Sequence, residues 1–215
     1  MAMQVQDPLS EAIAMALKLG KPRRFRQSVE LIVALKDVDP RSPEARLREI
    51  VYLPHKPPKE PHICVVADGD MALKAREAGV EVFTRQDVLQ LRGNRKAAKK
   101  IARRCDWVLV RADLMGIAGG ALGPALGPRG KAPTPIPPAA NIVETIERFK
   151  RAVWVRMRNQ PQVMVRIGTE DMNPKELAEN ARAVLQVVEG RLGRQKIAKV
   201  YVKKTMGPPV QVTAW

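Results

Sequence analysis

A change of hydrophobic pattern within the chain is the feature that most constrains its fold. Early in the chain, Ser28–Val38 (SVELIVALKDV) alternates apolar and polar residues, which is typical of a strand with one buried face. After the proline-rich stretch Lys56–Pro61 (KPPKEP), His62–Ala67 (HICVVA) is an almost continuous apolar run. Such a run is expected of a parallel strand covered on both faces. The chain therefore predicts two kinds of sheet, one half-exposed and one fully covered.

Strands and helices alternate through the middle of the chain. Further strands are expected at Val80–Phe83 and Trp107–Val110, and helices at Asp68–Ala78, Thr84–Leu91, Asn94–Arg104 and Asn141–Arg151. This alternation predicts a small parallel α/β domain of the open-sheet kind. Met115–Pro138, which contains GGALGPALGPRGKAP, is expected to be irregular. It is not a phosphate loop, because Ala125 and Ala132 stand where that motif needs Gly and Ser or Thr.

The two ends of the chain predict a half-exposed sheet with two helices. The expected strands are Ser28–Val38, Arg46–Leu53, Val153–Met157, Val163–Ile167, Ile197–Val202 and Val210–Val212, with a turn at Pro40–Pro43. Asp7-Pro8 and Asn173-Pro174 carry helix-start signals. Neither end is large enough to bury its sheet alone, so we expect them to combine.

The expected fold class is α/β with two domains. A discontinuous α+β layer sandwich is formed by the N- and C-terminal segments, and it carries an inserted Rossmann-like parallel α/β domain. We expect the boundaries at 1–62 plus 152–215 for the first domain and 63–151 for the second. Hinges are expected near 56–62 and 151–159.

The charge of the chain restricts the class of partner. The net charge is +16 and the sequence pI is about 10.4, and so basic a surface favours a polyanion, either nucleic acid or an anionic membrane. No apolar run approaches the roughly 20 residues of a spanning helix, and Met1–Ser10 lacks the features of a signal peptide. We therefore expect a cytoplasmic protein without a membrane partner. Aromatic residues are only 4%, too few for extensive base stacking.

The cysteines and histidines indicate no cofactor chemistry. Cys64 and Cys105 lie in apolar surroundings without CxxC spacing, and we expect both to be reduced core residues. Because the two Cys and two His are well separated in sequence, we expect neither a zinc site nor any other metal or cofactor. His55 and His62 flank the proline-rich stretch and are expected at the surface. Three acids at predicted strand ends, Asp68, Asp70 and Asp113, are expected to cap helices.

Two basic segments are candidates for binding a polyanion. In KPRRFRQS, basic residues surround Phe25, which either packs into the core or is offered to a base or sugar. In Tyr201–Val212 (YVKKTMGPPVQV), two lysines precede Thr205, Met206 and Gly207 between two predicted strands. An ordinary strand–turn–strand with solvated lysines is the alternative interpretation of the second segment.

Several motifs together resemble the L1 family of ribosomal proteins, from the lateral stalk of the large subunit. They are LGPRGKAP, KKTMGPP, RRF followed by Ser28 and Glu30, VYLPH, and IGTEDM with ELAEN, and they extend over essentially the whole chain. The proline-rich linker and the absence of an N-terminal extension are more typical of archaeal members than of bacterial ones. In two places the chain departs from the family pattern: Ser28 stands where Thr is common, and Glu49 stands beside Arg48 where a small residue is usual.

The resemblance implies a structural protein of the large ribosomal subunit, monomeric within the ribosome, and not an enzyme. It implies that the domain of the two termini binds stalk rRNA, that the inserted domain lies on the side of the deacylated tRNA in the E site, and that members can repress translation of their own mRNA. The RNA-binding residues expected from it are Arg23, Arg24, Phe25, Ser28, Glu30, Arg48, Arg166, Gly168, Lys203, Lys204, Thr205, Met206 and Gly207. Arg129 and Lys131 are candidate contacts on the tRNA side or within the loop.

Two other classes of function stay open at this point. A nucleotide-dependent enzyme could use the inserted α/β domain, although the chain has no phosphate loop and no evident Ser-His-Asp or Cys-His set. A general nucleic-acid-binding regulator would also be basic, although no helix-turn-helix or zinc finger is visible.

Overall fold

The structure is a computed structural model that describes residues 7–42 and 47–215. The chain divides into two compact units. The first is built from both ends of the chain, up to Lys59 and from Arg151 onward, and the second from Glu60–Lys150. Each helix in the described part of the chain is too short or too polar to span a membrane.

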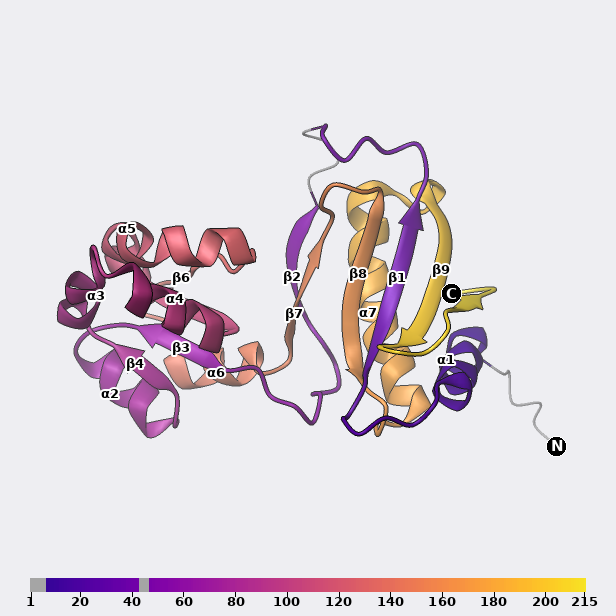
Figure 1. Ribbon diagram of the computed structural model, residues 1–215, viewed down its shortest axis with the longest axis horizontal. Helices are drawn as coiled ribbons and strands as arrows, with labels where there is room; N and C mark the ends of the chain where they lie inside the picture. The colour runs from indigo at the N-terminus through magenta and orange to yellow at the C-terminus, as the bar shows by residue number, and fades with distance from the viewer. Residues whose placement is uncertain (1–6, 43–46) are drawn as a thin grey trace. The chain divides into compact units, whose positions relative to one another are not determined.

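A four-stranded antiparallel sheet forms the centre of the first unit (Figure 1). Its strands are β1 (Ser28–Leu35), β8 (Gln162–Thr169), β9 (Ile197–Lys204) and β10 (Val210–Val212), in the order β10-β9-β1-β8. A separate antiparallel pair joins β2 (Arg48–Tyr52) to β7 (Ala152–Arg156). Parts of the predicted strand Arg46–Leu53 and of the turn Pro40–Pro43 fall in residues 43–46 and lie outside the described residues.

Two helices, α1 (Pro8–Leu19) and α7 (Pro174–Leu192), cover one face of this sheet. Asp7 and Asn173 cap them, and Glu176 completes a capping box at the start of α7. A short 3-10 turn, η4 (Arg194–Lys196), leads from α7 into β9. The alternating apolar residues of the strands face these helices and form one core with them.

A parallel sheet forms the centre of the second unit. Its strands are β3 (Ile63–Val66), β4 (Glu81–Phe83), β5 (Trp107–Arg111) and β6 (Thr134–Ile136), in the order β4-β3-β5-β6. The helices are α2 (Asp70–Glu77), α3 (Arg85–Leu91), α4 (Arg95–Arg104) and α6 (Ile142–Phe149), and η2 (Ala112–Leu114) follows β5. The fold class expected from the sequence is confirmed: an antiparallel α+β layer with an inserted parallel α/β unit.

The glycine-rich segment was wrongly predicted to be irregular. It forms α5 (Met115–Leu126), which includes Pro124, then η3 (Gly127–Arg129) and the edge strand β6. Glycines lower the helix propensity, but Ala118, Leu122 and Leu126 make a buried stripe that packs on α3 and α4. Tertiary packing therefore outweighs local propensity in this segment.

The expectation of two reduced cysteines was also wrong. Cys64 in β3 and Cys105, just after α4, form a disulfide with their Cα atoms 5.7 Å apart. The crossover between two neighbouring parallel strands brings the cysteines together, although they are 41 residues apart in sequence. Intracellular proteins of some thermophiles do contain disulfides, so the bridge alone does not indicate secretion.

Of the three acids that were expected to cap helices, Asp68 bonds the first N–H of α3, whereas Asp70 and Asp113 cap no helix. Gly69 occupies the N-cap of α2 with a φ of 66°, and it has no side chain to cap with. The carboxylate of Asp68 instead accepts a hydrogen bond from the backbone N–H of Arg85, at 2.9 Å. Asp70 pairs with Lys74, and Asp113 pairs with Arg111. These acids are therefore occupied within the unit by neighbouring donors.

Candidate nucleic-acid interface

One face of the four-stranded sheet carries polar and basic side chains. Along β1, Val29, Leu31 and Val33 are fully buried, whereas the alternate residues Ser28, Glu30 and Ile32 are only partly buried. Helix α7 lies behind the sheet in Figure 1, and the buried residues of β1 face it. The partly buried residues Ser28, Glu30 and Ile32 therefore lie on the opposite face of the sheet. We call this second side the open face.

An acidic residue lies between two basic ones on the open face. Glu30 is the register partner of Arg166 in β8 and of Lys203 in β9. Side chains directly opposite each other across antiparallel strands are close enough to interact. The charges of Arg166 and Lys203 therefore offset the cost of placing a carboxylate on a surface that faces a polyanion.

Ser28 and Thr205 join the start of β1 to the loop after β9. The Ser28 N–H donates to Thr205 Oγ1 at 3.1 Å, and the Thr205 N–H donates to the Ser28 carbonyl at 3.0 Å. The Thr205 hydroxyl lies 3.3 Å from the same carbonyl and 3.5 Å from Glu30 Oε1. Residues that are 177 positions apart in sequence thus share one hydrogen-bonded cluster.

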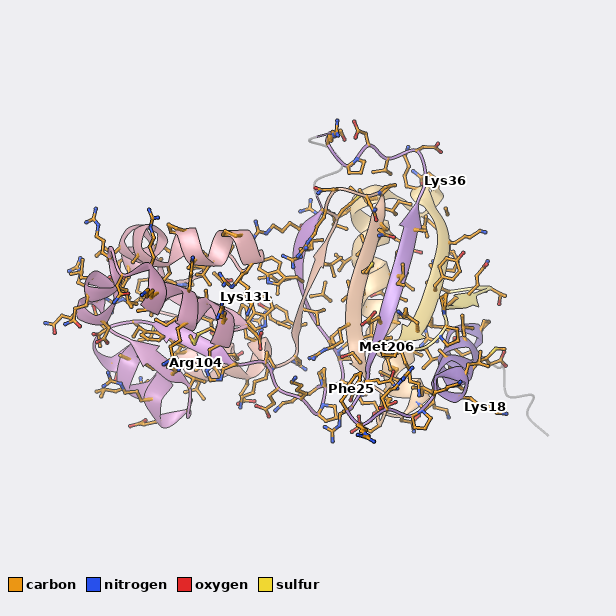
Figure 2. All side chains as sticks on the ribbon, viewed as in Figure 1. Lys18, Phe25, Lys36, Arg104, Lys131 and Met206 are labelled. Atoms are coloured by element: carbon orange, nitrogen blue, oxygen red, sulfur yellow. A yellow bond between two sulfur atoms is a disulfide. The ribbon has the colours of Figure 1, made fainter. Side chains whose placement is uncertain are left out.

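Two large apolar side chains project into solvent at the same end of the sheet. Phe25 is 52% exposed and Met206 is 57% exposed (Figure 2). The Met206 N–H donates to Gln27 Oε1 at 3.1 Å, which ties the loop after β9 to the segment that carries Phe25. The alternative that Phe25 packs into the core is therefore excluded. Exposed side chains of this size can cover a ribose or a base.

A buried polar network supports this end of the sheet, and sequence reasoning missed most of it. Gln27 is fully buried; its N–H donates to Glu170 Oε1 at 2.9 Å, and its side-chain amide donates to the Lys21 carbonyl at 3.0 Å. Lys204 Nζ lies 3.2 Å from Glu170 Oε2. The hydrogen bond from the Gln27 backbone and the nearby Lys204 ammonium lower the pKa of Glu170.

Two residues of the expected RNA-binding set are interior residues. Lys204 is only 5% exposed, and its ammonium is held by Glu170, so it supports the loop rather than contacting a phosphate. Gly168 is buried too, and a Cβ there would lie 2.6 Å from the sulfur of Met172. Gly168 therefore allows α7 to pack against β8, and it is not a point of close approach for a ligand.

Gly207 lies where a side chain would be tightly packed against the rest of the loop. A Cβ at this position would lie 3.3 Å from the Cα of Gly20, which ends α1, and 3.3 Å from the Cβ of Lys204. Its N–H donates to the Lys204 carbonyl at 2.9 Å and closes the turn. The small residue thus allows the loop and the end of α1 to approach each other, which fixes the position of Met206.

The remaining basic residues of the expected set lie at the surface of the first unit. Arg23 and Arg24 are exposed in the segment that precedes β1. Arg48, on β2, places its guanidinium 5.1 Å from the ring centroid of Trp154 on β7. Stacking of this kind orients a guanidinium without removing it from solvent.

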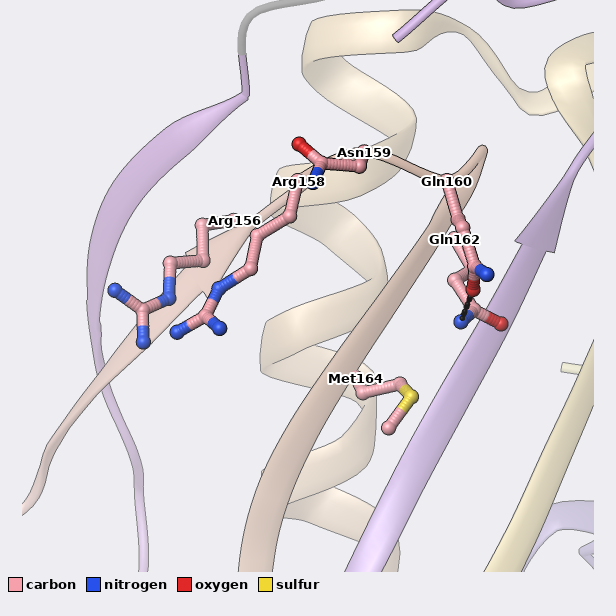
Figure 3. A pocket seen from close by; sticks show the side chains of 6 residues that line it. All are labelled: Arg156, Arg158, Asn159, Gln160, Gln162 and Met164. Carbon is pink, nitrogen blue, oxygen red and sulfur yellow. Dashed lines mark hydrogen bonds between the residues drawn. The ribbon is translucent and has the colours of Figure 1, made fainter. Parts of the chain in front are cut away.

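A pocket at the hairpin between β7 and β8 adds a basic region that sequence reasoning did not single out (Figure 3). Its volume is about 450 Å³, and its lining residues are Arg156, Arg158, Asn159, Gln160, Gln162 and Met164. Partial burial, together with the charges of Arg158 and Arg48, lowers the pKa of Arg156. Like charges held this close favour an anionic partner. The available sequence signal was Arg156 within the predicted strand Val153–Met157, with Arg158 directly after that strand.

The second unit places its basic residues differently from the expectation. Arg129 donates to the Ala125 carbonyl at 2.7 Å and so caps the end of α5, and Lys131 donates to the Cys105 carbonyl at 2.7 Å. Both candidate contacts thus have structural roles. A cluster of basic residues lies instead on one side of α4, and its members are Lys96, Lys99, Lys100, Arg103 and Arg104.

The fold and the open face together define a class: a basic, two-unit α/β protein with a surface suited to a polyanion. Cations, hydroxyls and exposed apolar side chains converge at one end of its antiparallel sheet.

The comparisons with known proteins identify the family within this class. The Ribosomal protein L1p/L10e family matches residues 16–208, and the chain belongs to this family. The protein named Large ribosomal subunit protein uL1 from Aeropyrum pernix is 69% identical over 96% of this chain and 95% of its own length. Those from Hyperthermus butylicus and Staphylothermus marinus are 54% and 55% identical, over 96% and 99% of both chains. The resemblance stated from the motifs, including its archaeal character, is thus confirmed.

Proposed function

We propose that this chain is a structural component of the large ribosomal subunit and binds the rRNA of the lateral stalk through its first unit. The relatives' printed name gives the large subunit as their place, which supports the expected location. The observation that carries the proposal is the cluster at one end of the open face, where Phe25 and Met206 flank the linked Ser28 and Thr205.

The residues on and around the open face are proposed to contribute to RNA binding in two different ways. Basic side chains such as Arg24, Arg166 and Lys203 contribute affinity by releasing counterions from phosphates, which depends on salt and little on sequence. Selection of one RNA site requires contacts to irregular backbone, 2′-hydroxyls and unstacked bases. Thr205 and Glu30 offer acceptors for such hydroxyls, and Met206 offers an adaptable apolar contact.

The test is a binding titration of the purified chain with a stalk rRNA fragment over a salt series, against duplex DNA and an unrelated RNA. Met206→Asp is compared with Met15→Asp on α1. Both methionines are more than half exposed, at 57% and 55%, so neither change should unfold the protein. We expect the parent to prefer the stalk fragment by at least about a hundredfold, near 3 kcal/mol.

The two variants give opposite outcomes under this proposal. Met206→Asp should remove the preference and leave weak, salt-dependent binding, whereas Met15→Asp should keep it. If all polyanions bind alike and the two variants behave the same, the basic surface is unspecific and the proposal fails. Equal affinity for duplex DNA and stalk rRNA would favour a general nucleic-acid-binding regulator instead.

The second unit is proposed to act on tRNA. With the segments 56–62 and 151–159 as hinges, it would move with the stalk and assist release of deacylated tRNA from the E site. The exposed cations of α4 support this role better than Arg129 and Lys131 do, because the latter are held by backbone carbonyls. Crosslinking of deacylated tRNA should fall in ribosomes whose chain carries both Lys99→Glu and Lys100→Glu. Incorporation of that chain into the large subunit should not change.

Repression of the chain's own mRNA is the last part of the proposal. Because the same open face would bind both RNAs, the stalk fragment should compete with the leader of the chain's mRNA. Met206→Asp should weaken both complexes in proportion. Binding of both RNAs at once by one protein molecule would contradict a shared site.

A further inference from the structure

The amino-terminal edge of the parallel sheet in the second unit brings together four side chains with metal-ligating atoms. His62 directly precedes β3, Cys64 is its second residue, and Glu81 begins β4 beside Cys64. Cys105 lies two residues before β5 and is bonded to Cys64. This edge is opposite to the carboxyl edge at which open α/β sheets bind their ligands, so the group is separate from any such site.

Two distances within this group, both to the Glu81 carboxylate, are close to those around a tetrahedral zinc ion. His62 Nε2 lies 3.4 Å from Glu81 Oε2, and Cys64 Sγ lies 3.7 Å from the same oxygen. Zinc bonds of about 2.1 Å to nitrogen or oxygen and 2.3 Å to sulfur put ligand atoms about 3.4 and 3.6 Å apart. The three ligand atoms all lie within 4.8 Å of one another.

We propose that the second unit binds a zinc-type divalent cation through His62, Cys64, Glu81 and Cys105 when the disulfide is reduced. The disulfide and the metal site exclude each other, because the bridge uses both sulfurs. Two electrons and two protons from a dithiol reductant convert the bridge into two thiols, and the dithiol becomes a disulfide. The cation then binds the two thiolates, which release two protons.

A small movement is enough to convert one state into the other. Two thiolates on one zinc ion stand about 3.8 Å apart, so the sulfurs need to separate by about 2 Å. Cys105 lies in the turn between α4 and β5 and not inside a strand, so this separation does not require breaking the sheet ladder.

The surroundings of the four ligands fit such a site. Arg104 contacts Glu81 Oε1 and so orients the carboxylate, while Oε2 is the oxygen near His62 and Cys64. Partners that orient a ligand in this way strengthen metal binding. The side chains of His62 and Glu81 are 48% and 29% exposed, so a cation can reach the fully buried cysteines from solvent. The Asp106 carboxylate accepts a hydrogen bond from the His62 N–H at 3.1 Å. This bond joins the residue before β3 to the residue before β5.

The spacing of these residues in the sequence led to the expectation of no zinc site, since no two ligands form a CxxC or HxxxH pair. The fold supplies the proximity instead. His62, just before β3, is two residues from Cys64 and extends on the same side, and register pairing places Glu81 beside Cys64. This inference does not depend on RNA binding, which the first unit would carry.

The experiment measures zinc binding by the full-length chain in both redox states. The protein is reduced with a phosphine, which takes up the oxygen of one water molecule and itself binds zinc weakly, and it is desalted without oxygen. Zinc is then titrated in competition with a chromogenic chelator, and cobalt is used to report thiolate coordination by absorption. We expect one cation per reduced chain, bound at least a hundredfold more tightly than by the oxidised chain.

The chain provides a matched pair of histidines for the control. His62→Ala should weaken zinc binding at least tenfold. His55→Ala should not, because His55 is in the first unit, paired with Glu179 at 2.6 Å. Zinc should also protect Cys64 and Cys105 from alkylation and raise the melting temperature of the reduced chain only. Equal zinc affinity in the two redox states, equal effects of the two histidine changes, or a lack of cysteine protection would overturn the proposal.

Discussion

Lys204 and Glu170 form an ion pair beneath the loop that carries Thr205 and Met206, with Nζ and Oε2 3.2 Å apart. Lys204 is almost completely buried, whereas its neighbour Lys203 points to the open face beside Glu30. Alternation along β9 thus separates two adjacent lysines into an interior residue and a surface residue. The two should therefore affect different properties of the protein.

Lys204→Met should reduce stability, and Lys203→Met should reduce RNA affinity. Removing the Lys204 ammonium leaves the Glu170 carboxylate without its charge partner, which should cost on the order of 2 kcal/mol of unfolding free energy. Lys203→Met keeps the fold and loses one phosphate-directed charge, so the salt dependence of binding should become shallower by about one ion. Urea unfolding and salt-series titration of both variants check this. Equal loss of stability in both variants would contradict the assignment.

Stability should also depend on pH through Glu170. Hydrogen bonding from Gln27 and the charge of Lys204 lower its pKa in the folded state below the ordinary value of 4.5. A carboxyl group with a lowered folded-state pKa contributes stability above its unfolded-state pKa and loses it as pH falls through the folded-state pKa. The difference in unfolding free energy between the parent and Glu170→Gln should therefore be largest near pH 7 and shrink below about pH 4.5. A difference that stays constant from pH 7 to pH 3 would exclude this linkage.

Sequence periodicity predicted the strands and helices of the first unit closely, because each has one buried face and strong end signals. The capping residues Asp7 and Asn173 are examples of such signals. It could not predict that Gln27 and Lys204 are interior, because no local pattern distinguishes a buried polar residue from an exposed one. Their burial depends on Glu170, which lies far away in sequence.

The same limit applies to the cysteines and to α5. The disulfide and the proximity of His62 to Glu81 follow from the pairing of parallel strands, which local spacing does not encode. In α5, four glycines lower the helix propensity, so the sequence alone does not indicate a helix. The helix is stabilised because its apolar stripe packs against α3 and α4. Long-range packing decided each of these cases.

Gly120→Ala should stabilise the protein. Gly120 lies within α5, and a Cβ there would meet no described atom within 4 Å apart from its chain neighbours and the adjoining backbone of the helix. Alanine loses less backbone entropy than glycine on forming a helix, so the gain should be about 0.5–1 kcal/mol. Thermal unfolding should show a higher melting temperature. A loss of stability would mean that α5 is not helical at this position.

Gly168→Ala should destabilise the protein. The added methyl group would lie 2.6 Å from the sulfur of Met172 and in contact with the side chain of Leu177. Overpacking of this kind costs about 1–3 kcal/mol. Because Gly168 is interior, the folded fraction should bind the stalk fragment as the parent does. A selective loss of RNA affinity at unchanged stability would restore Gly168 as a contact residue.

Glu30→Gln should reduce the selectivity of RNA binding while increasing affinity for polyanions in general. The change keeps the size of the side chain and removes the negative charge between Arg166 and Lys203, so the attraction of this face for any phosphate backbone should rise. A neutral amide is a weaker acceptor for a 2′-hydroxyl or a base amine than a carboxylate, so contacts specific to the stalk fragment should weaken. We expect the ratio of affinities for stalk rRNA and duplex DNA to fall by about tenfold, or 1.4 kcal/mol.

Fluorescence anisotropy with both ligands at one salt concentration measures that ratio. Glu49→Gln, on β2 and paired with Arg191, is the control, and it should leave the ratio unchanged. If both affinities rise equally in Glu30→Gln, Glu30 only balances charge and does not contact the RNA.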